Sequence, residues 1–178
     1  MALGRTWLLG LWLATLPGPE PATAQPVPLE YPVKAAFLAK FGPFVDWPAG
    51  SFTGPESHLA ICVAGEDPFG DALDEVAREH SVAGRPLAVR RLPPRDGAEG
   101  CHILYLGEGA DGLLGSVAGR PVLTVTDAAM APAARGILHF EVREDRVRFH
   151  VDDAAAARAG LGISSKLLGL ALSVVPRG

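Results

Sequence analysis

The sequence has little that would mark a nucleic-acid-binding or membrane-spanning protein. Its 178 residues include 16 Lys and Arg against 20 Asp and Glu, so the formal net charge is −4. Phosphate backbones attract a basic face, and no stripe of Lys and Arg with interleaved aromatic residues is present. After Gln25 no apolar run approaches the ~20 residues that a transmembrane helix needs. We therefore expect no nucleic-acid partner and no direct insertion of the mature chain into a membrane.

The N-terminus has the features of a secretory signal peptide, predicted over residues 1–24. Arg5 precedes an apolar run at 7–16 that is too short to cross a bilayer about 30 Å thick. Prolines then break any helix, and Ala-Thr-Ala at 22–24 offers the small side chains that a signal peptidase accepts. We expect cleavage after Ala24 and a mature chain that begins at Gln25. An uncleaved anchor is the alternative, and it would export the rest of the chain equally.

Cysteine is scarce as well, because Cys62 and Cys101 are the only two. In an oxidising compartment such a pair favours a disulfide. It would close a loop of about 40 residues and stabilise the fold by roughly 4 kcal/mol. Two buried free thiols are the alternative. A metal site is a weaker one, because the two thiols do not form a C-x-x-C sequence.

The hydrophobic pattern predicts one α/β domain over residues 33–178, preceded by a Pro-rich extended arm at 25–32. Val33, Phe37 and Phe41 recur at helical spacing, and Gly42-Pro43 should end or kink this first helix. Strands are predicted at 59–64, 87–91, 102–106 and 122–125, a hairpin at 137–142 and 147–151, and further helices at 67–80, 153–159 and after Ser164. Strands on both sides of a helix favour a mixed, partly parallel sheet flanked by helices, with a C-terminal β-hairpin and helices.

Two of these helices begin at residues that are typical caps. Asp67 precedes Pro68, and an Asp side chain can accept from free amides while proline needs no partner at the first helical position. Ser164 is predicted to cap a last helix. The apolar residues of that helix are Leu167, Leu168, Ala171, Leu172 and Val175.

Alternation in the predicted hairpin assigns its side chains to two faces around a turn at 143–146. The outer face should pair Glu141 with Arg148 and His139 with His150. The inward residues are Leu138, Phe140, Val142, Val147, Phe149 and Val151. Two imidazoles on an exposed surface supply too few ligands for a typical metal site, so we expect exposed histidines there.

Residues 107–112 spell G-x-G-x-x-G after a predicted strand, and Asp127 stands where a ribose-binding acid would follow. Only about residues 113–118 remain for the helix that should follow, and the motif does not open a first βαβ unit. We therefore favour a Gly-rich connection over a dinucleotide site. Ser164-Ser165-Lys166 fits neither G-x-S-x-G nor S-x-x-K. The sequence thus predicts no catalytic residues, no metal and no cofactor.

An ordered set of short blocks resembles the YfiR family of small periplasmic proteins over nearly all of the mature chain. The blocks are Tyr31-x-Val33-Lys34-Ala35-Ala36-Phe37-Leu38, Phe41, Trp47-Pro48, Cys62, Asp67-Pro68-Phe69, Gly84-Arg85-Pro86, Cys101-His102-Ile103-Leu104, Leu123-Thr124-Val125, Arg148-Phe149 and Ile163-Ser164-Ser165-Lys166-Leu167-Leu168. The chain departs from the family pattern at Gly42-Pro43, at Arg135 and at Asp152, which puts local turn geometry in question.

The resemblance implies a sandwich-like α/β domain, a Cys62–Cys101 disulfide and a homodimer. It also implies a periplasmic, non-enzymatic regulator that binds the periplasmic portion of an inner-membrane signalling protein, a diguanylate cyclase or a sensor, and so restrains cyclic di-GMP signalling and biofilm formation. A periplasmic small-ligand-binding accessory protein of a sensor or transporter is the main alternative. An enzyme is a third.

The helix at 153–159 is the predicted partner-binding surface. Its small side chains would let another backbone approach closely, and its arginine could pair with a carboxylate. The predicted contact residues are Ala154, Ala155, Ala156, Ala157 and Arg158. The alternative is that these alanines serve only helix propensity on an exposed face.

Overall fold

The computed structural model of the chain describes residues 28–93, 97–127 and 134–178. The predicted signal peptide, its cleavage site and the start of the predicted arm lie outside the described residues. The elements in chain order are α1 Glu30–Phe41, η1 Gly42–Phe44, β1 Val45–Asp46, β2 Leu59–Ala64, α2 Asp71–Glu79, β3 Ser81–Val82, β4 Arg85–Leu92, β5 Ile103–Leu106, α3 Asp111–Ser116, β6 Leu123–Thr126, β7 Leu138–Arg143, β8 Arg146–Asp152, α4 Asp153–Arg158, β9 Gly162–Ile163, α5 Ser165–Leu168 and β10 Val174–Val175. No helix in these ranges is long and apolar enough to cross a membrane.

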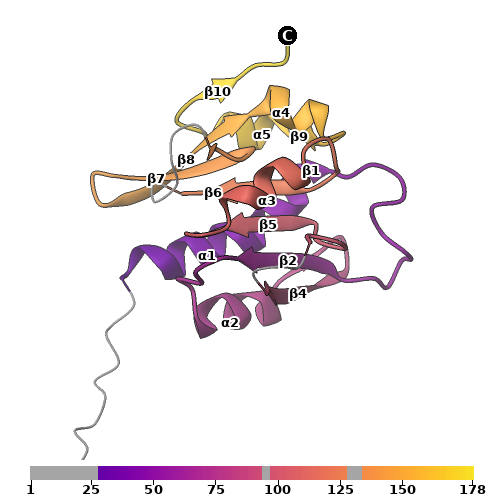
Figure 1. Cartoon of the computed structure of the whole chain (residues 1–178), viewed down its shortest axis with the longest axis horizontal. Helices are drawn as coiled ribbons and strands as arrows, with labels where there is room; N and C mark the ends of the chain where they lie inside the picture. Colours follow the sequence, from indigo (N-terminus) through magenta and orange to yellow (C-terminus); the bar gives the residue numbers. More distant parts are fainter. Residues whose placement is uncertain (1–27, 94–96, 128–133) are drawn as a thin grey trace, which may run out of the picture.

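The main sheet has the strand order β10-β8-β7-β6-β5-β2-β4-β3, and β1 pairs separately with β9. β4, β2, β5, β6 and β7 run parallel, whereas β3 pairs antiparallel with β4 and β8 pairs antiparallel with β7. The predicted mixed α/β sheet is therefore confirmed. From β2 the chain passes to β4 on one side and then returns to β5 on the other, so the order reverses between β2 and β5 (Figure 1).

Alternate side chains of the central strands belong to two cores, one on each face of the sheet. Ile61 and Val63 of β2 pack in the larger core with α1 and α2, while Cys62 and Ala64 pack in a smaller core with Val117 after α3. Figure 1 shows α3 in front of the sheet and α1 behind it. Burial on both faces explains why β2 is apolar throughout, as is typical of parallel strands.

The predicted disulfide lies in the smaller core. Cys62 in β2 is bonded to Cys101, which comes just before the neighbouring strand β5, and their Cα atoms are 5.8 Å apart. The bond spans a sequence separation of 39 residues. It links β2 to the residues that lead directly into its neighbour β5.

The first helix is longer than predicted. α1 begins at Glu30, so residues 30–32, predicted as the end of the extended arm, are helical. Pro32 is tolerated there because an N–H in the first turn has no intrahelical acceptor. α1 ends at Phe41 and Gly42–Phe44 form a 3-10 turn, which confirms the predicted break at Gly42-Pro43.

The second helix begins later than predicted, at Asp71 instead of Asp67. The Asp67 carboxylate accepts a hydrogen bond from the Phe69 N–H at 2.8 Å and pairs with Arg91 Nε at 2.9 Å. It therefore closes a turn before the helix and ties that turn to β4. The local sequence could not show whether Asp67 would cap a helix or close a turn before it.

The hairpin has the predicted register, with Glu141 opposite Arg148 and His139 opposite His150. Glu144 and Asp145 both have positive φ, as a type I′ turn requires. Of the residues predicted to point inward, Leu138, Phe140, Phe149 and Val151 are buried, Val147 is half-buried and Val142 is exposed near the tip.

The predicted last helix is wrong beyond its first turn. The Ser164 hydroxyl accepts from the Leu167 N–H at 3.3 Å, so the cap is confirmed, but α5 ends at Leu168. The Leu172 N–H donates to the Phe149 carbonyl at 2.8 Å, and β10 pairs in parallel with β8. The edge of β8 that faces away from β7 offers backbone N–H and C=O groups to this segment, and these hydrogen bonds compete with those of a helix. Sequence periodicity alone does not reveal that edge.

Candidate functional site

The edge of the sheet where β2 and β5 end is the first place to look for a ligand site, because open α/β sheets bind ligands where strand order reverses. Here the two loops are hydrogen-bonded to each other. The Gly107 N–H donates to the Ala64 carbonyl at 2.8 Å, and the Glu66 N–H donates to the Glu108 carbonyl at 3.0 Å. A Cβ on Gly65 or on Gly107 would collide with the opposite backbone. These glycines therefore serve loop-to-loop contact. A cavity of about 460 Å³ lies beside them, lined by Ala64, Gly65, Leu92, Pro93, Glu108, Gly109, Ala110, Gly112 and Leu113. The described residues that line it include Glu108 but no Lys or Arg, so they offer a pyrophosphate no cationic partner.

Asp127, placed by the G-x-G-x-x-G hypothesis as a ribose ligand, is only 3% exposed. Its carboxylate accepts from the Tyr105 hydroxyl at 2.6 Å and from Lys34 Nζ at 3.3 Å. α3, the helix that should receive a phosphate, has only six residues. The motif is thus a Gly-rich connection, as the sequence favoured.

Lys34 joins this carboxylate to the first helix. Its ammonium also lies 3.2 Å from Glu30 and 4.5 Å from the centre of the Tyr31 ring. Burial and the adjacent Asp127 carboxylate raise the pKa of the Tyr105 phenol, so this group stays protonated and donates. A buried cation with two carboxylates and a donating phenol is a satisfied network that fixes α1 against β5 and β6.

A cavity of about 110 Å³ lies beside this network. It is lined by Tyr31, Glu66, Pro68, Tyr105, Gly107, Glu108 and Asp127. Small-molecule sites are usually several times larger, so the cavity suits water better than a substrate.

The cross-strand histidines do not form a metal site. His139 is buried, contrary to the predicted exposed imidazole, and its Nδ1 lies 3.0 Å from the Thr126 hydroxyl. Burial lowers its pKa, so the neutral form is favoured. His150 contacts Glu141 through Nε2 and Ser173 through Nδ1, each at 2.7 Å. Within the described residues no group of three or more His, Cys, Asp or Glu side chains could hold a metal ion.

α4 carries the predicted contact residues, and the structure divides them. Ala156 is fully buried in the larger core, so its prediction as a contact residue is wrong. Ala154 and Ala155 are half-buried, whereas Ala157 and Arg158 are exposed. One helical face thus supplies core packing and the opposite face reaches solvent, an arrangement that a run of identical alanines conceals.

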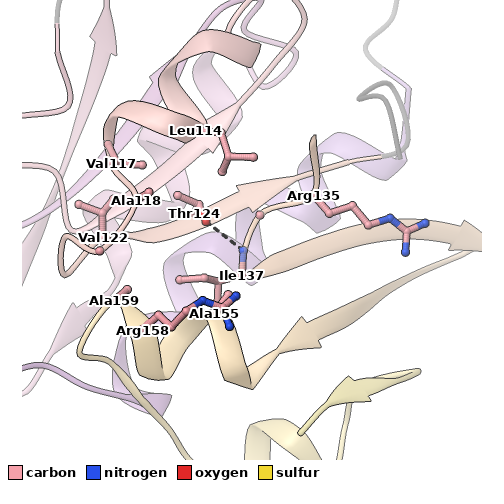
Figure 2. Close-up of a pocket in the computed structure, with 12 residues that line it drawn as sticks. Leu114, Val117, Ala118, Val122, Thr124, Arg135, Ile137, Ala155, Arg158 and Ala159 are labelled. Atoms are coloured by element: carbon pink, nitrogen blue, oxygen red, sulfur yellow. Dashed lines mark hydrogen bonds between the residues drawn. The ribbon is translucent and has the colours of Figure 1, made fainter. Parts of the chain in front are cut away.

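A cavity of about 190 Å³ lies between α3, β6 and α4 (Figure 2). Ala155 and Arg158 line it from α4, and Leu114 lines it from α3. Behind them the Ile137 N–H donates to the Thr124 hydroxyl at 2.9 Å. The Arg135 side chain, although part of the rim, points away from the cavity.

The start of α4 is held by charged side chains. The Asp152 carboxylate accepts from the Ala155 N–H at 2.6 Å and caps the helix. Asp153 is buried and forms two hydrogen bonds with Arg177, each at 2.9 Å. Asp152 therefore supplies the cap of α4.

The match to known families extends over most of this fold. The family model described as YfiR/HmsC-like matches residues 31–172, from the first turn of α1 to the segment after α5. The chain belongs to the YfiR/HmsC-like family. No curated protein matches it significantly.

The YfiR/HmsC-like family is periplasmic and regulatory rather than catalytic. In this member the loops at the usual ligand edge are hydrogen-bonded to each other, and the buried ionic groups hold α1 in place. Exposed faces are the other surfaces to which a partner could bind.

One such face was missed at the level of sequence. The hairpin pattern placed Glu141 opposite Arg148, which is confirmed, and the Glu141 carboxylate contacts His150 Nε2 at 2.7 Å. Leu172, assigned to a helix, lies beside the hairpin and is exposed. The three closely spaced arginines at 143, 146 and 148 were the available signal.

Proposed function

We propose that the mature protein is a periplasmic regulator that binds and restrains the periplasmic part of an inner-membrane diguanylate cyclase. The family match over residues 31–172 carries this proposal. Support also comes from the disulfide, which suits an oxidising compartment.

The exposed face of α4 is the proposed contact surface. Ala157 and Arg158 reach solvent there, and half-buried Ala154 and Ala155 flank them. The small alanines allow a partner backbone to come close, and the guanidinium can form a bidentate pair with a carboxylate of the partner. Ala156 acts only as core packing.

Deletion of the gene should raise cyclic di-GMP and surface attachment, and the full-length protein should reverse both. A version without residues 1–24 should fail, because it would not reach the periplasm. If deletion leaves cyclic di-GMP unchanged while a sensor or transporter loses its response to a small molecule, the ligand-binding alternative replaces this function.

Charge reversal on α4 tests the contact surface separately. Arg158→Glu should release the cyclase without unfolding the protein. Arg78→Glu is the matched control, since Arg78 is also an exposed arginine in the last turn of a helix, α2. Equal restraint by both variants would show that α4 is not the contact surface.

The homodimer stays a prediction. Sedimentation equilibrium of the mature protein measures it directly, and a monomer at micromolar concentration would contradict it.

A further inference from the structure

The outer face of the β7–β8 hairpin carries an unusual pairing of like charges. Arg143 lies directly opposite Arg146, and Arg148 follows on the same face two residues further along β8. Like charges directly opposite each other destabilise a sheet. All three side chains are exposed, so core packing does not explain their presence.

Nearby carboxylates do little to compensate these charges. Glu141 is the cross-strand neighbour of Arg148, but its carboxylate contacts His150 Nε2 at 2.7 Å. None of the ion pairs between described residues includes the three arginines. Among the described residues Glu144 is the one acid that lines the same hollow, whereas Asp145, also in the turn, lines a different hollow with Arg146. Three arginines therefore share this hollow with one carboxylate, in a protein whose net charge is −4.

Apolar side chains adjoin these arginines. Arg143, Glu144, Arg146, Arg148 and Leu172 line a shallow hollow of about 210 Å³. Leu172 is 37% exposed, and Leu170, two residues earlier, is 60% exposed. β10 continues along the edge of β8 with Val174 and Val175 exposed. Figure 1 shows the hairpin extending beyond the neighbouring strands, and the arginines that it carries are exposed.

We propose that this arginine face, defined as Arg143, Arg146, Arg148 and Leu172, adsorbs to an anionic phospholipid surface. Guanidinium groups form bidentate hydrogen bonds with phosphate oxygens, and their aliphatic stems can lie along an apolar layer while the charge stays in the headgroups. Leu172 and Leu170 would enter the headgroup boundary, as apolar residues of interfacial segments do. Contact is peripheral and no segment spans the bilayer.

The spread of the arginines favours a lipid surface over a protein partner. They come from two strands and lie over an open sheet face with a shallow hollow instead of a deep pocket. An array of mobile phosphates can meet each guanidinium without a fitted counterpart. This inference does not depend on the identity of the protein partner, although adsorption would bring a regulator close to any inner-membrane protein.

Vesicle binding by the mature, disulfide-bonded protein tests the proposal. The protein should co-sediment with vesicles containing phosphatidylglycerol and cardiolipin at low salt, and much less with phosphatidylcholine alone or at high salt. Arg143→Gln/Arg146→Gln/Arg148→Gln should weaken binding by about 5-fold per arginine, on the order of 100-fold in total. Leu172→Ser should weaken the vesicle binding that remains at high salt, where charge is screened.

A second triple variant controls for net charge. Arg78→Gln/Arg90→Gln/Arg120→Gln removes the same charge from other parts of the surface and should bind vesicles like the native protein. Equal binding by the two triple variants would overturn the proposal, as would absence of binding to anionic vesicles. If the hairpin variant no longer restrains the cyclase in cells while the native protein binds none of the vesicles, the arginines contact a protein and the lipid assignment is wrong. If restraint fails but vesicle binding persists, only the proposed function is affected.

Discussion

The two halves of the main sheet differ in whether their charged side chains are buried and paired or exposed. In the parallel half, the charges of Lys34 and Asp127 are buried, hydrogen-bonded and shielded by Tyr105. In the hairpin half, Arg143, Arg146 and Arg148 are exposed and form no ion pair with described residues. Buried charge without a partner is costly, whereas exposed charge is tolerated, so the first arrangement serves the fold and the second is open to a ligand.

Removing the disulfide should have the largest effect on the parallel half. Cys62→Ala/Cys101→Ala should lower the free energy of unfolding by about 4 kcal/mol, since it frees a loop with a sequence separation of 39 residues. Urea unfolding of native and variant proteins measures the difference. A loss of less than about 1 kcal/mol would mean that β2 and β5 do not need the bond.

Breaking the buried ion pair should have the next largest effect. Asp127→Ala leaves the Lys34 ammonium and the Tyr105 hydroxyl without their shared acceptor and should cost about 3 kcal/mol, the low end of the range for a broken buried pair because Glu30 remains beside Lys34. Glu75→Ala removes an exposed carboxylate from α2 and serves as the control. Equal stability of the two variants would contradict a structural role for the network.

Lowering the pH should weaken the fold through His102. Its Nδ1 accepts from the Ala60 N–H at 3.1 Å, and burial lowers its pKa. The unfolded chain therefore binds the proton more readily, so stability is complete above the ordinary histidine pKa of about 6.5 and falls as the pH drops below it. The pKa values of Asp74 and Glu141 are also lowered, so the effects of these carboxylates on stability fall at more acidic pH than the effect of His102.

Urea unfolding at pH 7.5 and pH 5.5 measures this change. His102→Gln should reduce the dependence and leave the part due to His139, whose pKa burial also lowers, and His58→Gln, at an exposed position, should keep it in full. A native protein that is equally stable at both pH values would show that the imidazole is not held in its neutral form.

Neutralising the hairpin arginines should have the smallest effect on stability. Arg143→Gln/Arg146→Gln/Arg148→Gln removes an opposed like-charge pair, so we expect a gain within about 0.5 kcal/mol. Thermal unfolding measures it. A large loss would place these arginines among the groups that hold the fold together and would weaken the contrast between the two halves.

Short-range patterns predicted much of this molecule correctly. Apolar runs located β2, β5 and β6, alternation set the register of the hairpin, and Ser164 was identified as a cap. Each depends on neighbours in the chain. The Cys62–Cys101 bond was predictable as well, because the chain has only two cysteines.

Errors arose where one side chain had several possible partners in space. Asp67 could cap a helix but closes a turn beside Arg91. Ala156 has the same local sequence as its neighbours, yet it lies in the core.

The α/β class, the disulfide, the hairpin and the family could be predicted from the chain alone, because periodicity, residue scarcity and ordered blocks are properties of the chain. Three features could not: Asp127 is a buried partner of Lys34, the Gly-rich loop is hydrogen-bonded to the loop after β2, and β10 replaces the end of a helix. The physical reason is the same in each case. Burial and hydrogen-bond competition are settled between segments far apart in the sequence, where local propensity carries no information.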